Sequence, residues 1–221
     1  MVSNIKAIVF DVYGTLFDVH SIVKKCEEEF GDKGQEVSLI WRQKQVEYSF
    51  LRELMGRYQP FSKITFDALK YAVSSVGIQP KEEQLLQLMA EYQHLTPYKE
   101  VETVLSSLKG KQLAVFSNGS RDMLEPLLNN SGLQSYFSSI LSVDDRKAFK
   151  PTPTSYTAVL EELQVERKEV LFLSSNGWDI SGAKSFGFQT AWVNRKGSPR
   201  EQLDLQPDIE IEDLSELVNL L

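Results

Sequence analysis

Cysteine and histidine are almost absent from this chain of 221 residues. The single cysteine, Cys26, cannot form an internal disulfide, and the two histidines, His20 and His94, are too few for the usual zinc sites. No apolar stretch approaches the ~18 residues of a membrane span, and the N-terminus lacks a basic region followed by an apolar core. We therefore expect a cytoplasmic protein without a membrane partner.

Positive charge is also scarce. The chain has 24 lysines and arginines against 31 acidic residues, a net charge of −7, and it contains no basic run. Nucleic-acid binding is therefore not expected, because a phosphate-binding surface needs clustered cations. The strings G-x-S-x-G, G-x-x-x-x-G-K-[ST] and G-x-G-x-x-G are missing as well, so any chemistry must use other groups.

Strand-like runs alternate with helical patterns over most of the chain. Apolar runs predict strands at 5–10, 113–116, 140–143, 170–173 and 190–193, and the segments between predict helices at about 99–109, 121–131, 153–164 and 178–186. At the start of the helix predicted at 153–164, Thr152 suits the N-cap and Pro153 suits the first helical position. This alternation predicts a doubly wound, Rossmann-like parallel sheet that binds ligands beyond the carboxyl ends of its strands.

Residues 20–96 interrupt the alternation, with helical patterns at about 20–30, 37–55, 65–76 and 81–95. We interpret them as an inserted four-helix cap. The predicted division is an α/β core at 1–18 and 97–221 and a cap at 19–96. Because the insertion leaves the sheet just after "FDVYGTLFD" (10–18), it should arch over that segment as a lid.

Four polar segments fall near the predicted binding edge of the sheet: Asp11 with Thr15, Ser117 with Asn118, Lys150, and Ser174 to Asp179. Each alone has an ordinary structural explanation as a turn, a cap or a surface charge. Four such segments at one edge of one sheet instead predict an active site.

The order of "FDVYGTLFD", "SNGS", "KAFKPTP" and "SSNGWDISGA" resembles the haloacid dehalogenase superfamily, and within it the L-2-haloacid dehalogenases. The resemblance covers essentially the whole chain. It includes "WRQKQVEYSFLRELM" (41–55), which is similar to the arginine-bearing lid helix of those enzymes. It implies an α/β core with a four-helix cap, a homodimer, and no cofactor.

Two positions depart from the phosphatases that make up most of this superfamily. Those enzymes carry a second aspartate two residues after the nucleophile, where this chain has Tyr13, and a metal-binding acid where it has Ser175. Mg²⁺ favours carboxylate oxygens, so losing one weakens a metal site. A halide leaves without a proton, so dehalogenation needs neither acid, and we expect no metal ligands.

We assign the nucleophile to Asp11, which would attack the α-carbon, invert it and form an ester that water then hydrolyses. An L-2-haloacid would give a D-2-hydroxy acid and halide. Nucleophile and substrate are both carboxylates, and two such charges ~4 Å apart repel by roughly 4 kcal/mol at a dielectric of ~20. Lys150 fits the cation that this arrangement requires.

The resemblance implies roles for further residues. Arg42 would stabilise the departing halide; without the resemblance, an arginine whose stem packs and whose charge reaches water would also explain it. On its predicted helix, Leu39, Val46, Phe50 and Leu54 form one face, which contains Gln43 and is bordered by Arg42. The remaining assignments are Tyr13, Gln43, Phe61 and Trp178 around the apolar part of the substrate, Ser117 at its carboxylate, Asn118 at the halide, Asp179 at the hydrolytic water, and Thr15, Ser174, Asn176 and Tyr156 as support.

Core packing explains Phe61 and Trp178 as readily. Two other functions also stay open at this point: a phosphatase of the same superfamily with atypical metal ligation, and a catalytically silent relative that acts as a binding protein.

Overall fold

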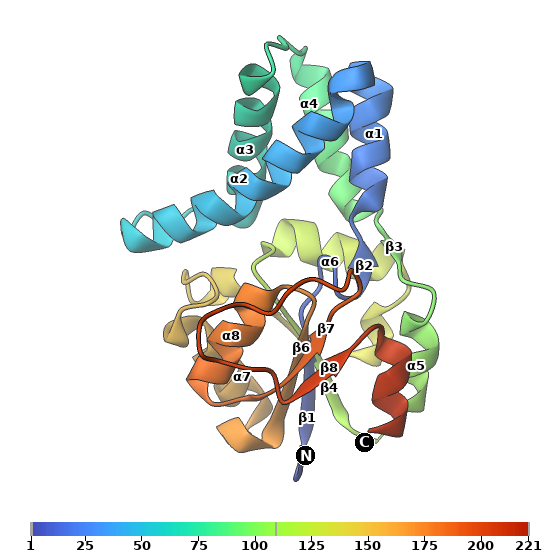
Figure 1. Ribbon diagram of the computed structural model, residues 1–221, viewed down its shortest axis with the longest axis vertical. Helices are drawn as coiled ribbons and strands as arrows, with labels where there is room; N and C mark the ends of the chain where they lie inside the picture. Colours follow the sequence, from blue (N-terminus) through green and yellow to red (C-terminus); the bar gives the residue numbers. More distant parts are fainter. Residues whose placement is uncertain (1, 109, 221) are drawn as a thin grey trace.

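The computed structural model describes residues 2–108 and 110–220. Its main sheet has six parallel strands in the order β5-β4-β1-β6-β7-β8 (Figure 1). Their bounds are β1 Ala7–Phe10, β4 Gln112–Ser117, β5 Ser139–Ser142, β6 Val170–Ser174, β7 Gln189–Val193 and β8 Ile209–Ile211. The chain adds strands on one side of β1 and then on the other, so the strand order reverses at β1. The carboxyl end of β1 is therefore the point where such sheets bind ligands.

Four helices connect these strands: α5 Val101–Ser107, α6 Arg121–Asn130, α7 Pro153–Leu163 and α8 Gly177–Phe186. Helices α7 and α8 cover one face of the sheet, and α5 with the 3₁₀ helix Leu214–Asn219 covers the other (Figure 1). The predicted α/β fold is confirmed, and α7 begins with Thr152 as N-cap and Pro153 inside the first turn. Helix α5 is shorter than its predicted range, of which residue 109 lies outside the described residues.

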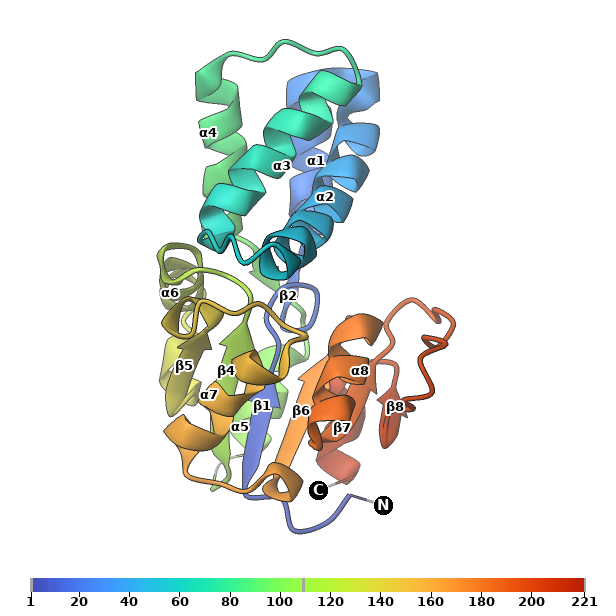
Figure 2. The ribbon, with the colours of Figure 1, turned by 90° about the vertical axis from the view of Figure 1, so that its left-hand side faces the viewer.

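The cap consists of α1 His20–Phe30, α2 Gly34–Leu54, α3 Phe61–Ser75 and α4 Glu82–Ala90, which pack side by side beyond one end of the sheet (Figures 1 and 2). Two short strands, β2 Phe17–Asp18 and β3 Thr96–Pro97, pair antiparallel where the chain enters and leaves the cap. The boundaries predicted at 18/19 and 96/97 lie at or beside this pair and stay a prediction. None of the described helices is long and apolar enough to cross a membrane.

Helix α2 buries a different face from the predicted one. Leu39 and Leu54 are 70% and 83% exposed, whereas the polar side chain of Gln45 is fully buried. Gln45 Nε2 donates hydrogen bonds to Thr65 Oγ1 at 3.1 Å and to Tyr92 Oη at 2.9 Å. Because its hydrogen bonds are satisfied, this amide can occupy the cap interior. The hydrophobic pattern alone therefore gave the wrong orientation for α2.

Candidate active site

The Asp11 carboxylate lies directly after β1, and its two oxygens have different surroundings. Oδ2 accepts hydrogen bonds from Thr15 Oγ1 at 3.0 Å, Asn176 Nδ2 at 3.0 Å and Ser174 Oγ at 3.3 Å. Oδ1 accepts from Lys150 Nζ at 3.0 Å. Oδ2 is thus held by three donors, and Oδ1 is the less occupied oxygen.

A tight turn after β1 brings Thr15 back over Asp11. The N–H groups of Thr15 and Leu16 both donate to Val12 O, and Gly14 has φ +85°, which a residue with a side chain rarely adopts. A Cβ on Gly14 would also lie only 3.0 Å from Ser175 Oγ. The glycine in "FDVYGTLFD" is therefore needed to place Thr15 beside the carboxylate.

Lys150 is buried between two carboxylates. Its Nζ donates to Asp11 Oδ1 at 3.0 Å, to Asp179 Oδ2 at 2.6 Å and to Phe116 O at 3.1 Å, which uses all three protons. Its backbone N–H donates to Asn118 Oδ1 at 2.9 Å. Burial alone would lower the pKa of Lys150, but the two carboxylates outweigh burial and raise it, so the ammonium stays charged.

Asp179, in the first turn of α8, is fully buried, and both of its oxygens are occupied. Tyr156 Oη donates to Oδ1 at 2.7 Å, while Lys150 holds Oδ2. Burial raises the pKa of Asp179 to about 6 against the opposing effect of Lys150. Gly182 permits this arrangement, because a Cβ there would lie 2.6 Å from Tyr156 Oη. Tyr156 therefore positions Asp179 and, through it, Lys150.

A small cavity of 20 Å³, the catalytic cavity, opens onto Asp11 and Lys150. It is lined by Asp11, Tyr13, Arg42, Val46, Ser49, Phe61, Ser117, Asn118, Lys150, Asn176 and Trp178. The structure thus brings together the predicted residues from the strand ends with those from the cap. Thr15, Ser174, Tyr156 and Asp179 lie behind this lining.

Two residues of α2 differ from expectation. Gln43 is exposed and is absent from the cavity lining, so the structure does not support its predicted contact with substrate. Ser49 lines the cavity and was not predicted. It follows Arg42 by seven residues, two helical turns, so helical spacing counted from Arg42 could have identified it.

Arg42 reaches down from α2 to the core. Its Nη2 donates to Asn176 Oδ1 over 3.4 Å, and among the described residues it forms no ion pair. Its side chain is half-buried and faces the cavity. A half-buried guanidinium without a counter-charge is suited to binding an anion.

Tyr13 is the residue that the sequence resemblance sets where phosphatases carry a second aspartate. It is buried, its ring meets the Tyr92 ring edge-on at 5.9 Å, and burial raises the pKa of its hydroxyl. Within the described part of the chain, Tyr13 Oη has no hydrogen-bond partner. A Cβ on Gly119 would lie 2.7 Å from Tyr13 Cε2, so the glycine of "SNGS" makes room for this ring.

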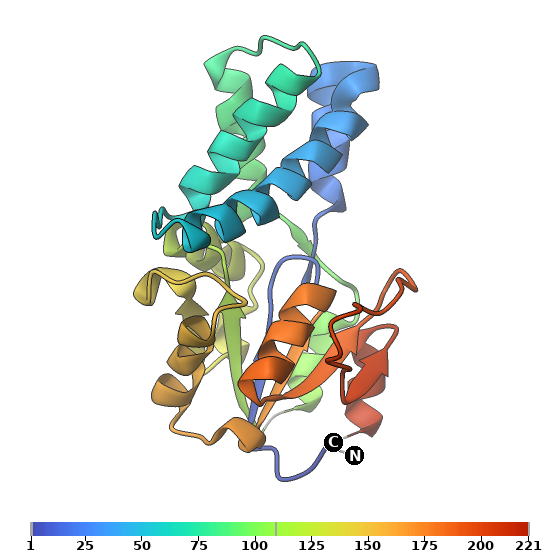
Figure 3. The same cartoon turned by 60° about the vertical axis from the view of Figure 1, so that its left-hand side comes forward.

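Helix α2 and the connection after it also contact the segment that carries Lys150. Phe149 N–H donates to Glu53 Oε2 at 2.7 Å, and the Tyr58 ring stacks on the Phe149 ring with centroids 4.8 Å apart. Tyr58 Oη also donates to Asp144. Figure 3 shows the end of α2 above this part of the core. The cap therefore contacts Phe149, the residue directly before Lys150.

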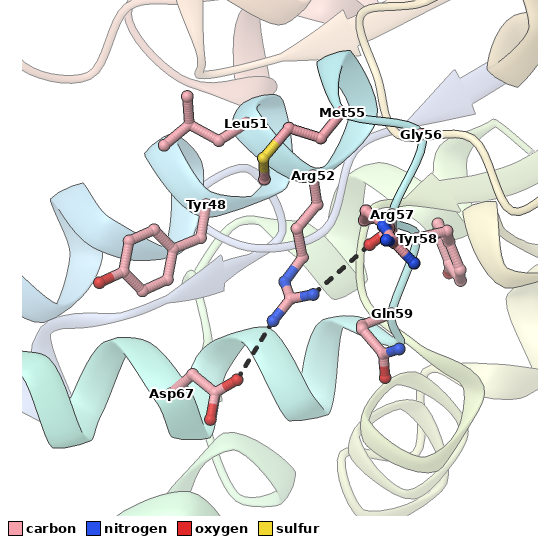
Figure 4. Close-up of a pocket in the computed structure, with 9 residues that line it drawn as sticks. All are labelled: Tyr48, Leu51, Arg52, Met55, Gly56, Arg57, Tyr58, Gln59 and Asp67. Carbon is pink, nitrogen blue, oxygen red and sulfur yellow. Dashed lines mark hydrogen bonds and ion pairs between the residues drawn. The ribbon is translucent and has the colours of Figure 1, made fainter.

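A larger groove of 750 Å³ lies in the cap between α2 and the start of α3 (Figure 4). Arg52 crosses it and donates to Asp67 Oδ2 and to Arg57 O, both at 3.4 Å. The groove includes none of the residues around Asp11. These bonds brace the connection that presents Tyr58 to the core.

Among the residues that the structure describes, no three histidine, cysteine, aspartate or glutamate side chains gather as metal ligands do. Ser175, at the position of a phosphatase metal acid, has its N–H bonded to Thr15 Oγ1 at 2.8 Å. The Lys150 ammonium lies between Asp11 and Asp179.

The chain is similar in sequence and structure to known hydrolases. It matches the family model of haloacid dehalogenase-like hydrolases over residues 5–187. It is 44% identical over 220 residues to (S)-2-haloacid dehalogenase 2 of Pseudomonas sp. (strain CBS-3), covering 99% of this chain and 96% of that protein. It is 41% identical over 220 residues to haloacetate dehalogenase H-2 of Moraxella sp. (strain B), covering 99% and 98%. The structure of L-2-haloacid dehalogenase from Xanthobacter autotrophicus with chloropropionic acid covalently bound aligns over 98% of both chains, with a TM-score of 0.93 and 40% identity.

Proposed function

This chain belongs to the L-2-haloacid dehalogenase family of the haloacid dehalogenase superfamily, and we propose that it converts short L-2-haloalkanoic acids to D-2-hydroxy acids and halide. It is an enzyme, a hydrolase that acts on carbon–halide bonds. The observation that carries the proposal is one cavity that exposes both the Lys150-bound carboxylate of Asp11 and the guanidinium of Arg42. A nucleophile and an acceptor for the leaving anion thus share one small space.

In the first step, Asp11 Oδ1 attacks C2 of the haloacid. A new C–O bond forms as the carbon–halogen bond breaks, so C2 inverts and the halide leaves with the bonding electrons. Lys150 offsets the repulsion between the two carboxylates. Arg42 and Asn118 stabilise the charge that develops on the halogen, and Ser117 holds the substrate carboxylate. The covalently bound chloropropionic acid in the Xanthobacter relative supports this route.

In the second step, water attacks the carbonyl carbon of the Asp11 ester. If Oδ1 carries the substrate, Oδ2 is the ester carbonyl, and negative charge gathers on it. The donors at Oδ2 are then an oxyanion hole made of Thr15, Ser174 and Asn176. Their positions around the resting carboxylate mean that little reorganisation is needed during hydrolysis.

Asp179 accepts the proton of the attacking water. When the tetrahedral intermediate collapses, the bond between Asp11 Cγ and the substrate-bearing Oδ1 breaks, and Asp179 returns the proton to the departing alkoxide, which becomes the hydroxyl group of the hydroxy acid. The pKa of Asp179, about 6, is close to the range in which a general base works well at neutral pH. In the resting structure Lys150 occupies Asp179 Oδ2. Esterification removes the negative charge of Asp11, so Lys150 loses one of its two partners and can shift. Water then gains access to Asp179.

The decisive experiment is halide release by the purified protein from both enantiomers of 2-chloropropionate, with and without a chelator. We expect chloride and D-lactate from the L-enantiomer in either condition. Metal-dependent phosphate release without halide release would instead identify a phosphatase. The absence of both halide release and phosphate release would identify a binding relative.

The ester itself is tested by one turnover in ¹⁸O-labelled water with enzyme in excess. We expect the label in the Asp11 carboxylate, because water attacks the carbonyl carbon of the ester. Label found only in the hydroxy acid would exclude the ester route. Asp11→Asn should be inactive at the first step.

Assembly and location remain proposals. We propose a cytoplasmic homodimer, and the apolar side chains of Leu39, Leu54 and Met55, exposed along and just after α2, provide an apolar surface for self-association. Sedimentation equilibrium tests the dimer, and a monomer at micromolar concentration would contradict it.

A further inference from the structure

A second cavity of 410 Å³ adjoins the catalytic cavity, and Tyr13, Arg42 and Asn176 line both. The catalytic cavity measures 20 Å³, little more than the ~10–15 Å³ that one water requires. The second cavity can hold an entire small haloacid. Three residues therefore separate the reacting atoms from a much larger space.

The second cavity has an excess of positive charge. Arg42, Arg195 and Lys196 line it, against the single carboxylate of Asp18; the exposed His20 also lies at its edge. Arg195 is neutralised by Glu100, whose Oε1 lies 2.6 Å from its Nη2. Arg42 and Lys196 form no ion pair within the described residues, so two free cations face one carboxylate. On a chain with a net charge of −7, this is a local reversal of sign.

Two residues that line this cavity, Arg195 and Tyr13, each carry a buried donor without an acceptor in the described part of the chain. The Arg195 guanidinium stacks on Tyr98, 3.7 Å from the ring centroid, and its Nη2 donates to Thr15 O at 2.9 Å. Its Nε is buried and has no hydrogen-bond partner among the described residues, and the same holds for Tyr13 Oη.

Arg195 Nε and Glu100 Oε1, which likewise has no hydrogen-bond partner within the described ranges, belong to one ion pair. A Cβ on Gly119, which does not line this cavity, would lie 3.1 Å from Tyr13 Oη. The cations of Arg42 and Lys196, rather than these donors, therefore provide the positive charge of the cavity.

We propose that this second cavity is an anion-binding antechamber that holds one small monovalent anion beside Arg42 and Lys196. Anions pass between the antechamber and the catalytic cavity when the Arg42 side chain moves. This proposal rests on the proposed function, because the incoming haloacid carboxylate and the departing halide are both small monovalent anions. Arg42 thus faces an anion on either side.

Ser198 offers a way to probe the antechamber without measuring turnover. It is exposed, it lines the cavity, and the natural Cys26 is buried, so Ser198→Cys introduces one accessible thiol. We would label it with methanethiosulfonates of similar size, one with a sulfonate and one with a trimethylammonium group. Ser74→Cys, at an exposed position near the end of α3, is the matched control.

Local positive charge should favour the anionic reagent. We expect the anionic-to-cationic rate ratio to be at least about threefold higher for the Ser198→Cys variant than for the Ser74→Cys variant. Bromide and D-lactate, each added alone, should slow labelling of the antechamber thiol and leave the control thiol unaffected. Protection by bromide alone identifies the halide route, and protection by D-lactate alone identifies the carboxylate route. Equal ratios in the two variants, or no protection by either anion, would overturn the antechamber.

Lys196→Glu provides a second test, with the exposed Lys168→Glu as a control of equal net charge far from the cavity. We expect Lys196→Glu to raise KM for L-2-chloropropionate about threefold to tenfold with little change in kcat. Equal KM values in the two variants would count against the antechamber. Labelling does not depend on catalysis, so an absence of dehalogenation would refute the proposed function and leave the anion site testable.

Discussion

At the scale of single residues, the buried ammonium of Lys150 determines whether the site is stable as well as active. It lies 3.0 Å from Asp11 and 2.6 Å from Asp179. Removing one partner of a buried ion pair typically costs about 3–5 kcal/mol, because the remaining charge loses its partner. We expect Lys150→Met to be inactive and to lower the free energy of unfolding in urea by about that much.

A double variant separates this effect from general damage. Asp11→Asn removes one of the carboxylates that Lys150 neutralises, so adding it to Lys150→Met should recover part of the lost stability. Purely additive losses in the double variant would show that the two charges are not coupled.

The pKa of Asp179 predicts the pH dependence of turnover. Burial raises it to about 6, and Asp179 must be deprotonated to accept a proton. Because esterification removes the Asp11 charge that helps to raise this pKa, we expect kcat at saturating substrate to be level near neutral pH and to fall about tenfold per pH unit only below a pKa that is lower than about 6. Chloride release measured from about pH 8 down to about pH 4 tests this, and a flat profile over that whole range would remove Asp179 from the role of base.

Protonation of Asp179 does not destabilise the folded state, so unfolding caused by this group cannot explain a loss of activity at low pH. A carboxyl whose pKa is raised by folding binds its proton more tightly in the folded state. Its contribution to stability therefore grows as the pH falls from the folded pKa of about 6 toward its unfolded value. The unfolding midpoint measured over the same range is the control.

The core residues of the site could be predicted because parallel strands end at one edge. Asp11, Ser117 and Ser174 each stand at or directly after the end of a strand, and pairing of β1 with β4 and β6 brings them together. Gln43 could not be placed in this way. Its position depends on which face of α2 packs into the cap, and buried hydrogen bonds rather than hydrophobicity decide that face.

At the scale of elements, Arg42 is not the only residue that α2 contributes to the site. Glu53 accepts a hydrogen bond from the N–H of Phe149, which directly precedes Lys150. We expect Glu53→Ala to lower kcat by about tenfold while KM changes less, because a misplaced Lys150 weakens the attack by Asp11. Glu53→Gln, which keeps an acceptor oxygen, should restore most of the rate.

Glu47→Ala is the control on the same helix. Glu47 pairs with Lys44 near the surface of the cap at 2.8 Å and should matter little to catalysis. Similar losses in Glu47→Ala and Glu53→Ala would mean that helix stability, rather than the contact with Phe149, sets the rate. Steady-state kinetics of the three variants distinguish these cases.

Long elements were easier to predict than short ones. Helices α1, α6, α7 and α8 lie close to their predicted ranges, because caps and helical spacing extend over several turns. Strand β8 has three residues, and β2 and β3 have two each. Such segments are too short for a periodic pattern, and they form only because a neighbouring strand is present to pair with them.

At the scale of the whole molecule, the reacting groups lie between two bodies that are joined at β2 and β3. On the side away from the antechamber, Ser62 N–H donates to Ser120 Oγ at 3.0 Å and links α3 to the start of α6. The catalytic cavity is too small to admit substrate without movement. Either the whole cap opens, or Arg42 moves and substrate passes through the antechamber.

A disulfide between Ser62→Cys and Ser120→Cys distinguishes the two routes. The 3.0 Å hydrogen bond from Ser62 N–H to Ser120 Oγ makes the two residues neighbours across the cap and the core, and Cys26 is buried and should not compete. If anions pass Arg42, the oxidised protein should keep more than about half of the kcat/KM of its reduced form. If the cap must open, oxidation should abolish turnover and dithiothreitol should restore it. The two single-cysteine variants, treated identically, control for loss of the Ser120 hydroxyl.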